Sequence, residues 1–303
     1  MRWFKTASGT TRGIVSMVLA TALFCCGDAM MKLAAATLPT TETMFVRSAT
    51  SAVLVLTFAW MTGALIHIRR GFSKAMAFRS GSDATASLLF QAALGRMHFA
   101  DVMAVLQISP LTLTAGSALF LGEKVGWRRW SAVAAGLFGA LLIVKPGTNS
   151  FTWWAVAAIL SVIAGAARDI STRRIDPLLP TPLIMGISAV VVSLASLLGA
   201  AFQDWQMPAG WTFFMLLCAG VCSMLGQLCV ITAVRAAEVS VVAPFRYAGI
   251  VWALILDLAI WAHVPDGWAM IGIVAVSAAG LYTVYRERVL RHQMARRIAE
   301  SVR

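Results

Sequence analysis

The chain has 303 residues, of which 59% are hydrophobic and 13% are charged, and its mean hydropathy is +0.80. Soluble domains carry about 25% charged residues, so this composition excludes an ordinary soluble fold and indicates a membrane protein with several spans. The net charge of +12 is attributed to membrane topology rather than to a nucleic-acid partner, because basic loops gather on one side of a bilayer.

Ten apolar segments approach the length of about 20 residues that a helix needs to cross a bilayer. In chain order they are Ile14–Ala36, Phe45–Ile66, Ala84–Phe99, Val102–Leu121, Trp130–Val144, Thr152–Ala167, Pro182–Phe202, Trp211–Val234, Val239–Ala262 and Trp268–Tyr285. The third segment is short, and a soft break near Gly95–His98 separates it from the fourth. Nine spans are therefore the alternative.

The lysines and arginines favour ten spans with both termini in the cytoplasm. With the N-terminus inside, 20 of the 25 basic residues fall on the cytoplasmic side, as the positive-inside rule requires. The opposite side holds Arg96 and Lys145, while Lys32, Arg47 and Arg246 lie within spans. The chain is expected in a bacterial inner membrane, surrounded by lipid.

A proline interrupts an apolar run once in each half of the chain, at Pro110 and at Pro244. A proline inside a helix removes one hydrogen bond and kinks the helix, so we expect both prolines to act as hinges. Ten spans divide into two sets of five, and two sets with an odd number of spans lie in opposite orientations. Such inverted repeats are common in secondary transporters, whose substrates bind near the membrane midplane.

The sequence thus predicts an all-α integral membrane fold of ten transmembrane helices in two inverted five-helix repeats. The first repeat covers residues 1–147 and the second covers residues 151–288. Residues 289–303 form a basic cytoplasmic tail. The sequence does not decide the oligomeric state, and a homodimer is left open.

Short motifs recur in order along both halves. The first half contains Ala100-Asp101, Ser109-Pro-Leu111, Gly122-Glu123 and Lys145-Pro-Gly147, and the second contains Arg168-Asp-Ile-Ser-Thr-Arg-Arg174 and Ala243-Pro-Phe-Arg-Tyr247. Together they resemble the drug/metabolite transporter superfamily, specifically its EamA-type ten-span carriers. The resemblance is closest to bacterial carriers that take up metabolites of the riboflavin or S-adenosylmethionine type. It implies a transporter with a small-molecule substrate and no cofactor.

Ionisable residues inside membrane spans cost free energy and mark candidate functional sites. Asp28 and Lys32 lie one helical turn apart, and they either neutralise each other or contact the substrate. Arg47 begins the second span, where its side chain is expected to extend to the membrane interface. Asp257 lies in the ninth span and is a further substrate-site candidate.

Arg246 is the strongest single candidate. It follows Pro244 by two residues, and with Tyr247 it is expected to contact a carboxylate, phosphate or carbonyl group of the solute. The alternative is a purely structural ion pair with Asp257 or Asp169. Substrate contact or gating is the role we predict.

Uncharged polar residues at membrane depth complete the candidate site. Gln91, Gln107 and Gln227 are predicted either to form hydrogen bonds between helices or to line a pocket. Trp252 lies in the middle of a span, where it is placed to stack on a planar ring of the solute.

A second charged group is expected at the cytoplasmic ends of the spans, where it consists of Arg168, Asp169, Arg173 and Glu123. A structural charge network is favoured over ligand contact for these four residues. Nucleotide-binding, catalytic and metal-ligating motifs are not recognisable in the sequence, so no enzymatic activity and no bound metal is expected.

The function predicted from the sequence is secondary transport of a small organic metabolite by alternating access. The candidate solutes are riboflavin, S-adenosylmethionine and amino-acid-like compounds. Export of amino acids, metallophores or drugs by the same fold is the alternative. A non-transporting membrane scaffold or lipid-handling protein is a third hypothesis, against which the charges buried in the spans argue.

Overall fold

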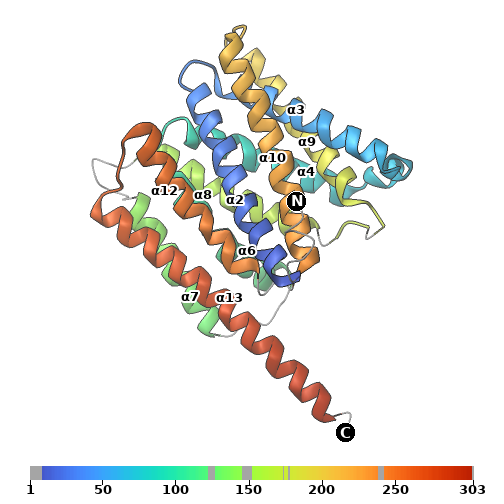
Figure 1. The fold of residues 1–303 in the computed structure, drawn as a ribbon, viewed down its shortest axis with the longest axis vertical. Helices are drawn as coiled ribbons and strands as arrows, with labels where there is room; N and C mark the ends of the chain where they lie inside the picture. Colours follow the sequence, from blue (N-terminus) through green and yellow to red (C-terminus); the bar gives the residue numbers. More distant parts are fainter. Residues whose placement is uncertain are drawn as a thin grey trace.

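The structure is a computed structural model that describes residues 9–121, 127–144, 152–172, 174–176, 178–237 and 242–301. Within these ranges the chain forms eleven α-helices, three short 3₁₀ helices and no strand (Figure 1). The first half contains α2 (Gly9–Ala34), α3 (Thr40–Met61), η1 (Ala64–Gly71), α4 (Lys74–Leu94), α5 (Phe99–Leu106), α6 (Ser109–Leu121) and α7 (Trp127–Val144). The second half contains α8 (Trp153–Thr172), α9 (Thr181–Leu198), η2 (Gly199–Ala201), α10 (Gly210–Ala236), η3 (Ala243–Tyr247), α12 (Ala248–Trp261) and α13 (Gly267–Ser301).

Six helical segments among the described residues are long and apolar enough to cross a membrane. They are Gly9–Ala34, Thr40–Met61, Phe99–Gly116, Trp153–Thr172, Thr181–Ala201 and Gly210–Ala233. Two shorter apolar helices, Val133–Ile143 and Gly267–Tyr282, accompany them. The predicted all-helical membrane class is confirmed, and the count of ten spans stays a prediction.

Helices of the first half pack mainly against helices of the second half. α2 packs on α10, α4 on α8, α3 on α9, α5 on α12 and α7 on α13. The contact of α6 with α8 has a counterpart in the contact of α12 with α2, and α3 with α10 has a counterpart in α9 with α4. Most of the main contacts therefore have a counterpart when the two halves are exchanged, and the halves interleave across one bundle.

The third apolar segment begins earlier than the sequence predicts. α4 covers Lys74–Leu94 instead of Ala84–Phe99. Its first turn is stabilised by Ser73, whose hydroxyl accepts a hydrogen bond from the backbone N–H of the third helical residue at 3.1 Å. Arg79 and Asp83, which hydropathy assigned to a loop, therefore lie inside a helix. The short third segment is explained by these charges, because they lower its hydropathy without ending the helix.

The fourth segment is two helices rather than one. α5 ends at Leu106 and α6 begins at Ser109, one residue before Pro110. The intervening Gln107 and Ile108 bond to carbonyls three residues back, as in a 3₁₀ turn. A proline disfavours helical geometry in the residue before it and is tolerated in the first turn of a helix. The break therefore precedes Pro110, which lies in the first turn of α6.

The ninth segment starts in a similar way. Pro244 is the second residue of the 3₁₀ helix η3, and α12 continues from it to Trp261. The start of the predicted ninth segment, residues 239–241, lies outside the described residues. Both predicted hinge prolines thus occur where a regular α-helix begins, and their role as hinges stays a prediction.

The last helix, α13, continues without interruption for 35 residues to Ser301. The predicted last span, Trp268–Tyr285, and the predicted tail, 289–303, are therefore consecutive parts of one helix as far as it is described. Figure 1 shows the C-terminal part of α13 projecting away from the other helices. The first part of α13 packs along α7.

Glycines allow α7 and α13 to approach each other closely. A Cβ atom on Gly272 would lie 2.5 Å from the carbonyl oxygen of Gly139, and one on Gly139 would lie 2.9 Å from the carbonyl oxygen of Gly272. Small residues at such contacts are typical of membrane helices, whose association depends on close packing. This pair joins the last helices of the two halves.

Candidate functional site

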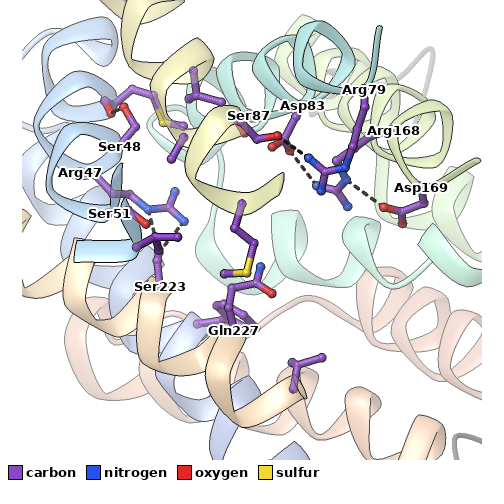
Figure 2. Close-up of a pocket in the computed structure, with 18 of the residues that line it drawn as sticks. Arg47, Ser48, Ser51, Arg79, Asp83, Ser87, Arg168, Asp169, Ser223 and Gln227 are labelled. Atoms are coloured by element: carbon purple, nitrogen blue, oxygen red, sulfur yellow. Dashed lines mark hydrogen bonds and ion pairs between the residues drawn. The ribbon is translucent and has the colours of Figure 1, made fainter. Parts of the chain in front are cut away.

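A polar cavity of about 410 Å³ lies between the two halves (Figure 2). α2, α3 and α4 of the first half line it, together with α8, α9, α10 and η3 of the second half. Figure 2 shows two groups of polar side chains on different sides of the cavity. The Arg47 group comprises Arg47, Ser48, Ser51 and Ser223, and the Arg168 group comprises Arg79, Asp83, Ser87, Arg168 and Asp169.

Arg47 links three helices on its side of the cavity. Its Nε and Nη2 atoms donate to the hydroxyl oxygen of Ser223 on α10 at 3.1 and 2.9 Å. Its Nη2 also lies 3.7 Å from the carboxylate of Asp28 on α2. Arg47 therefore does not extend to the membrane interface as predicted, since its side chain is 19% exposed and is bound inside the bundle. Asp28 pairs with Arg47 rather than with Lys32.

Arg168 is held by two carboxylates in the second group. Its Nη1 donates to Asp83 on α4 at 2.9 Å, and its Nε donates to the neighbouring Asp169 at 2.8 Å. Both bonds join opposite charges, so Arg168, Asp83 and Asp169 form a triad that is both hydrogen-bonded and charge-paired. The predicted structural role of this network fits the geometry, and the triad also lines the cavity. Two predicted members, Arg173 and Glu123, lie outside the described residues.

Arg79 completes the second group without an ion pair among the described residues. Its Nε donates to the hydroxyl of Thr172 on α8 at 2.9 Å, and its Nη1 donates to the hydroxyl of Ser188 on α9. Ser188 in turn lies 3.3 Å from the hydroxyl of Ser80 on α4. Arg79 therefore joins α4, α8 and α9 through neutral partners.

Arg246, the strongest candidate from the sequence, lines the same cavity from η3, and its contact with a substrate stays a prediction. Its side chain is exposed, and in the described part of the chain it makes no hydrogen bond and no ion pair. The predicted alternative of an ion pair with Asp257 or Asp169 is therefore not realised. Gln227 on α10 also lines this cavity, in agreement with the prediction that it lines a pocket.

Lys32 and Asp257 lie elsewhere, around the turn that joins α4 to α5. The Lys32 Nζ donates to the carbonyl oxygen of Leu94, the last residue of α4, at 2.9 Å and to that of Met97. The Asp257 carboxylate accepts hydrogen bonds from the first two N–H groups of α5, those of Phe99 and Ala100, at 3.3 Å each. A cation at a helix C-terminus and an anion at a helix N-terminus both oppose the helix dipole. The two residues hold this turn from either side.

A second cavity, of about 510 Å³, contains Lys32, Asp257 and two histidines. His263 Nδ1 lies 2.8 Å from the Asp257 carboxylate, and the His263 ring stacks on the ring of His98 with 3.5 Å between centroids. On α4, the residue of the first cavity nearest to this turn is Ser87, seven residues before Leu94, which is about 10 Å along the helix at 1.5 Å per residue. The predicted candidates thus divide between two places.

Three other candidates each have a buried polar side-chain atom without a hydrogen-bond partner in the described part of the chain. They are Gln91, Tyr247 and Trp252. The Tyr247 hydroxyl packs directly against Gly280. A Cβ atom added at Gly280 would lie 1.5 Å from the hydroxyl oxygen. Gln107 lies at the break between α5 and α6, with its amide nitrogen against Gly249. Within the structure none of these side chains lines the first cavity.

Sequence patterns alone did not identify four components of the site, namely Arg79, Asp83, Ser188 and Ser223. Arg79 and Asp83 are spaced four residues apart, which places oppositely charged groups on one face of a helix. That spacing, after the capping Ser73, was the available signal. The serines carried no signal, since an isolated serine in an apolar helix usually bonds to its own backbone.

Comparison with known proteins matches both halves of the chain to one family, the EamA-like transporter family, over residues 11–145 and 152–286. The pseudopaline exporter CntI of Pseudomonas aeruginosa is 29% identical over 269 residues, which cover 88% of this chain and 94% of that protein. A riboflavin transporter of Vibrio cholerae is 31% identical over 58% of this chain and 60% of its own length. An S-adenosylmethionine uptake transporter of Rickettsia felis is 27% identical over 59% of this chain and 60% of its own length.

Several solved structures are similar in fold. One crystal structure among them covers 93% of this chain and 98% of its own, with a TM-score of 0.64 and 16% sequence identity. At that identity the similarity concerns the fold alone.

Proposed function

This chain belongs to the EamA-like transporter family, and from that premise we propose that it is a secondary transporter of a small organic metabolite in the bacterial inner membrane. The observation that carries the proposal is the polar cavity of about 410 Å³, which side chains of both halves line. A polar cavity between two halves is where a transporter built from repeats binds its substrate. The family and the named relatives indicate a transporter and not an enzyme.

The architecture we propose is ten spans in two inverted five-helix repeats, residues 1–147 and 151–288, followed by the basic tail 289–303. The paired contacts between the halves support a division into two repeats, because a two-fold relation between repeats generates pairs of this kind. The positive-inside rule supports cytoplasmic termini, although Arg79 and Arg168 belong to the cavity rather than to loops.

We propose that transport proceeds by alternating access, with bends near Pro110 and Pro244. Pro110 lies in the first turn of α6, after the 3₁₀ turn at Gln107 and Ile108, and Pro244 lies in the 3₁₀ helix η3 that precedes α12. Such junctions absorb changes in backbone angles. The partnerless polar atoms of Gln91, Tyr247 and Trp252 support a second arrangement of the helices. A buried polar atom without a partner costs about 1–3 kcal/mol, which an arrangement that hydrates or binds it would recover.

The solutes we propose first are an amino-acid-like compound, S-adenosylmethionine or riboflavin, taken up into the cell. Two of these are named for relatives that align with about three-fifths of this chain. Export is the second candidate function. The observation that favours export is the similarity to the pseudopaline exporter, which extends over 88% of this chain.

The test is uptake in a bacterial host that lacks its own carriers, with labelled riboflavin, S-adenosylmethionine and a mixture of amino acids. Saturable uptake of one compound above that of cells with an empty vector is the expected result. Lower accumulation of a preloaded solute, without uptake, would establish the exporter instead. If neither occurs for any of these solutes, the proposed transport of this substrate group is wrong.

A further inference from the structure

The charges around the first cavity do not cancel. Four arginines line it, namely Arg47, Arg79, Arg168 and Arg246, against the two aspartates Asp83 and Asp169. Asp28, which lies beside Arg47, is a third carboxylate at the edge of the site. Four positive charges therefore face three negative charges among the described residues, and one guanidinium is left without a counter-charge.

The contacts of the arginines identify which guanidinium that is. Arg168 is bonded to two carboxylates, Arg79 to two hydroxyl groups, and Arg47 to one hydroxyl and, at 3.7 Å, to Asp28. Arg246 alone among the four has no partner in the described part of the chain, although its side chain is exposed to the cavity. Among the described residues, no group occupies the donors of its guanidinium, which leaves them to a ligand.

We propose that the transported solute carries a carboxylate group and that Arg246 binds this carboxylate. The inference rests on the proposed function, since it states the chemistry of the solute for the same cavity. A planar guanidinium forms two parallel hydrogen bonds with a carboxylate, a geometry that a carbonyl or hydroxyl group does not offer. A surplus of one positive charge is balanced by one carboxylate, whereas a phosphate carries about 1.5–2 negative charges at neutral pH.

This inference divides the candidate solutes. Amino-acid-like compounds and S-adenosylmethionine carry a carboxylate, and riboflavin carries none. The polar lining of the Arg47 group, with hydroxyls from Ser48, Ser51 and Ser223, supplies neutral hydrogen-bonding groups for the rest of such a solute. The inference therefore ranks amino-acid-like compounds and S-adenosylmethionine above riboflavin among the proposed solutes.

Binding of two small probes of the same shape tests the inference on the purified full-length protein in detergent. Benzoate and benzamide differ in the carboxylate alone, and their dissociation constants are measured by thermal shift at constant ionic strength. The variants are Arg246→Gln and, as the matched control, Arg69→Gln. Arg69 is an exposed arginine of η1 that does not line the cavity. Because binding is measured without transport, failure here is distinguishable from failure of the uptake assay.

Benzoate is expected to bind wild type roughly tenfold or more tightly than benzamide, as the loss of a charge-assisted hydrogen bond implies. Arg246→Gln is expected to abolish this preference, and Arg69→Gln is expected to retain it. The inference is overturned if benzamide binds as tightly as benzoate, if the preference survives in Arg246→Gln, or if benzoate leaves the wild-type melting temperature unchanged.

Discussion

The carboxylate of Asp257 lies 2.8 Å from Nδ1 of His263, six residues further along the chain. Asp257 is 1% exposed and belongs to α12, while the N–H groups it accepts from belong to α5. One buried carboxylate thus connects the α12–α13 turn to the first turn of a helix in the other half. Asp257 performs the capping that His98, at the N-cap position of α5, does not perform with its own side chain.

Asp257→Ala is expected to destabilise the protein by about 1–2 kcal/mol, because it leaves two helix N–H groups without an acceptor. His263→Ala keeps both of these hydrogen bonds and is expected to cost less. Thermal unfolding of the purified variants in detergent measures both effects. Equal melting temperatures for Asp257→Ala and wild type would show that the cap contributes no stability.

Arg168→Gln is expected to destabilise the protein, because it leaves Asp83 and Asp169 close together without their shared cation. Breaking a partly exposed charge triad of this kind costs on the order of 2 kcal/mol. The triple variant that also carries Asp83→Asn and Asp169→Asn removes the repulsion and is expected to recover part of that loss. The melting temperatures of Arg168→Gln, of the Asp83→Asn/Asp169→Asn variant and of the triple variant form a mutant cycle that measures the coupling between Arg168 and the two aspartates. If the losses of the first two add up to the loss of the triple variant, the triad contributes no stability.

Arg246→Ala is expected to abolish transport while leaving membrane insertion and the melting temperature unchanged, because this side chain has no protein partner among the described residues. Arg246→Lys keeps the charge but loses the paired hydrogen bonds, so partial activity is expected from it. Transport is measured by the uptake assay, and insertion is measured by the amount of protein in the membrane fraction. Normal transport by Arg246→Ala would assign Arg246 to the scaffold.

Gly272→Ala is expected to destabilise the contact between α7 and α13, because its Cβ would lie 2.5 Å from a backbone carbonyl oxygen that cannot rotate away. Overpacking of this kind typically costs about 1–3 kcal/mol. Gly267→Ala, on the same helix but with no atom within 4 Å of the added Cβ, is the matched control. Melting temperatures of the two variants are compared. If both melt alike, the close approach of the helices is not required.

The positions of most helices were predictable because hydropathy and proline depend on the local sequence. The start of α4 was missed for the same reason, since Arg79 and Asp83 resemble a loop when they are judged by hydropathy alone. Their partners, Thr172, Ser188 and Arg168, come from helices about 90 residues further along the chain or more. A single sequence does not show which helices pack together, so such partners were out of reach.

The candidate residues were predictable as a class but not by role. Ionisable groups inside spans were selected because burial of a charge is costly, and this criterion does not distinguish a ligand contact from a helix cap. Arg246 and Gln227 line the cavity, whereas Lys32 and Asp257 stabilise helix ends. A ligand and a helix end can each stabilise a charged side chain inside a span. Only the folded structure shows whether the backbone of a helix end lies beside that side chain.

The continuous α13 has a mechanical consequence. A helix of 35 residues is about 52 Å long, and the hydrocarbon core of a bilayer is about 30 Å thick, so α13 is about 20 Å longer than that core is thick. A tilt of α13 by roughly 10° would move its far end by roughly 9 Å, from the length of the helix alone. A fluorophore attached at the end of α13 would therefore act as the tip of a lever and report small rotations within the bundle as large displacements (Figure 1).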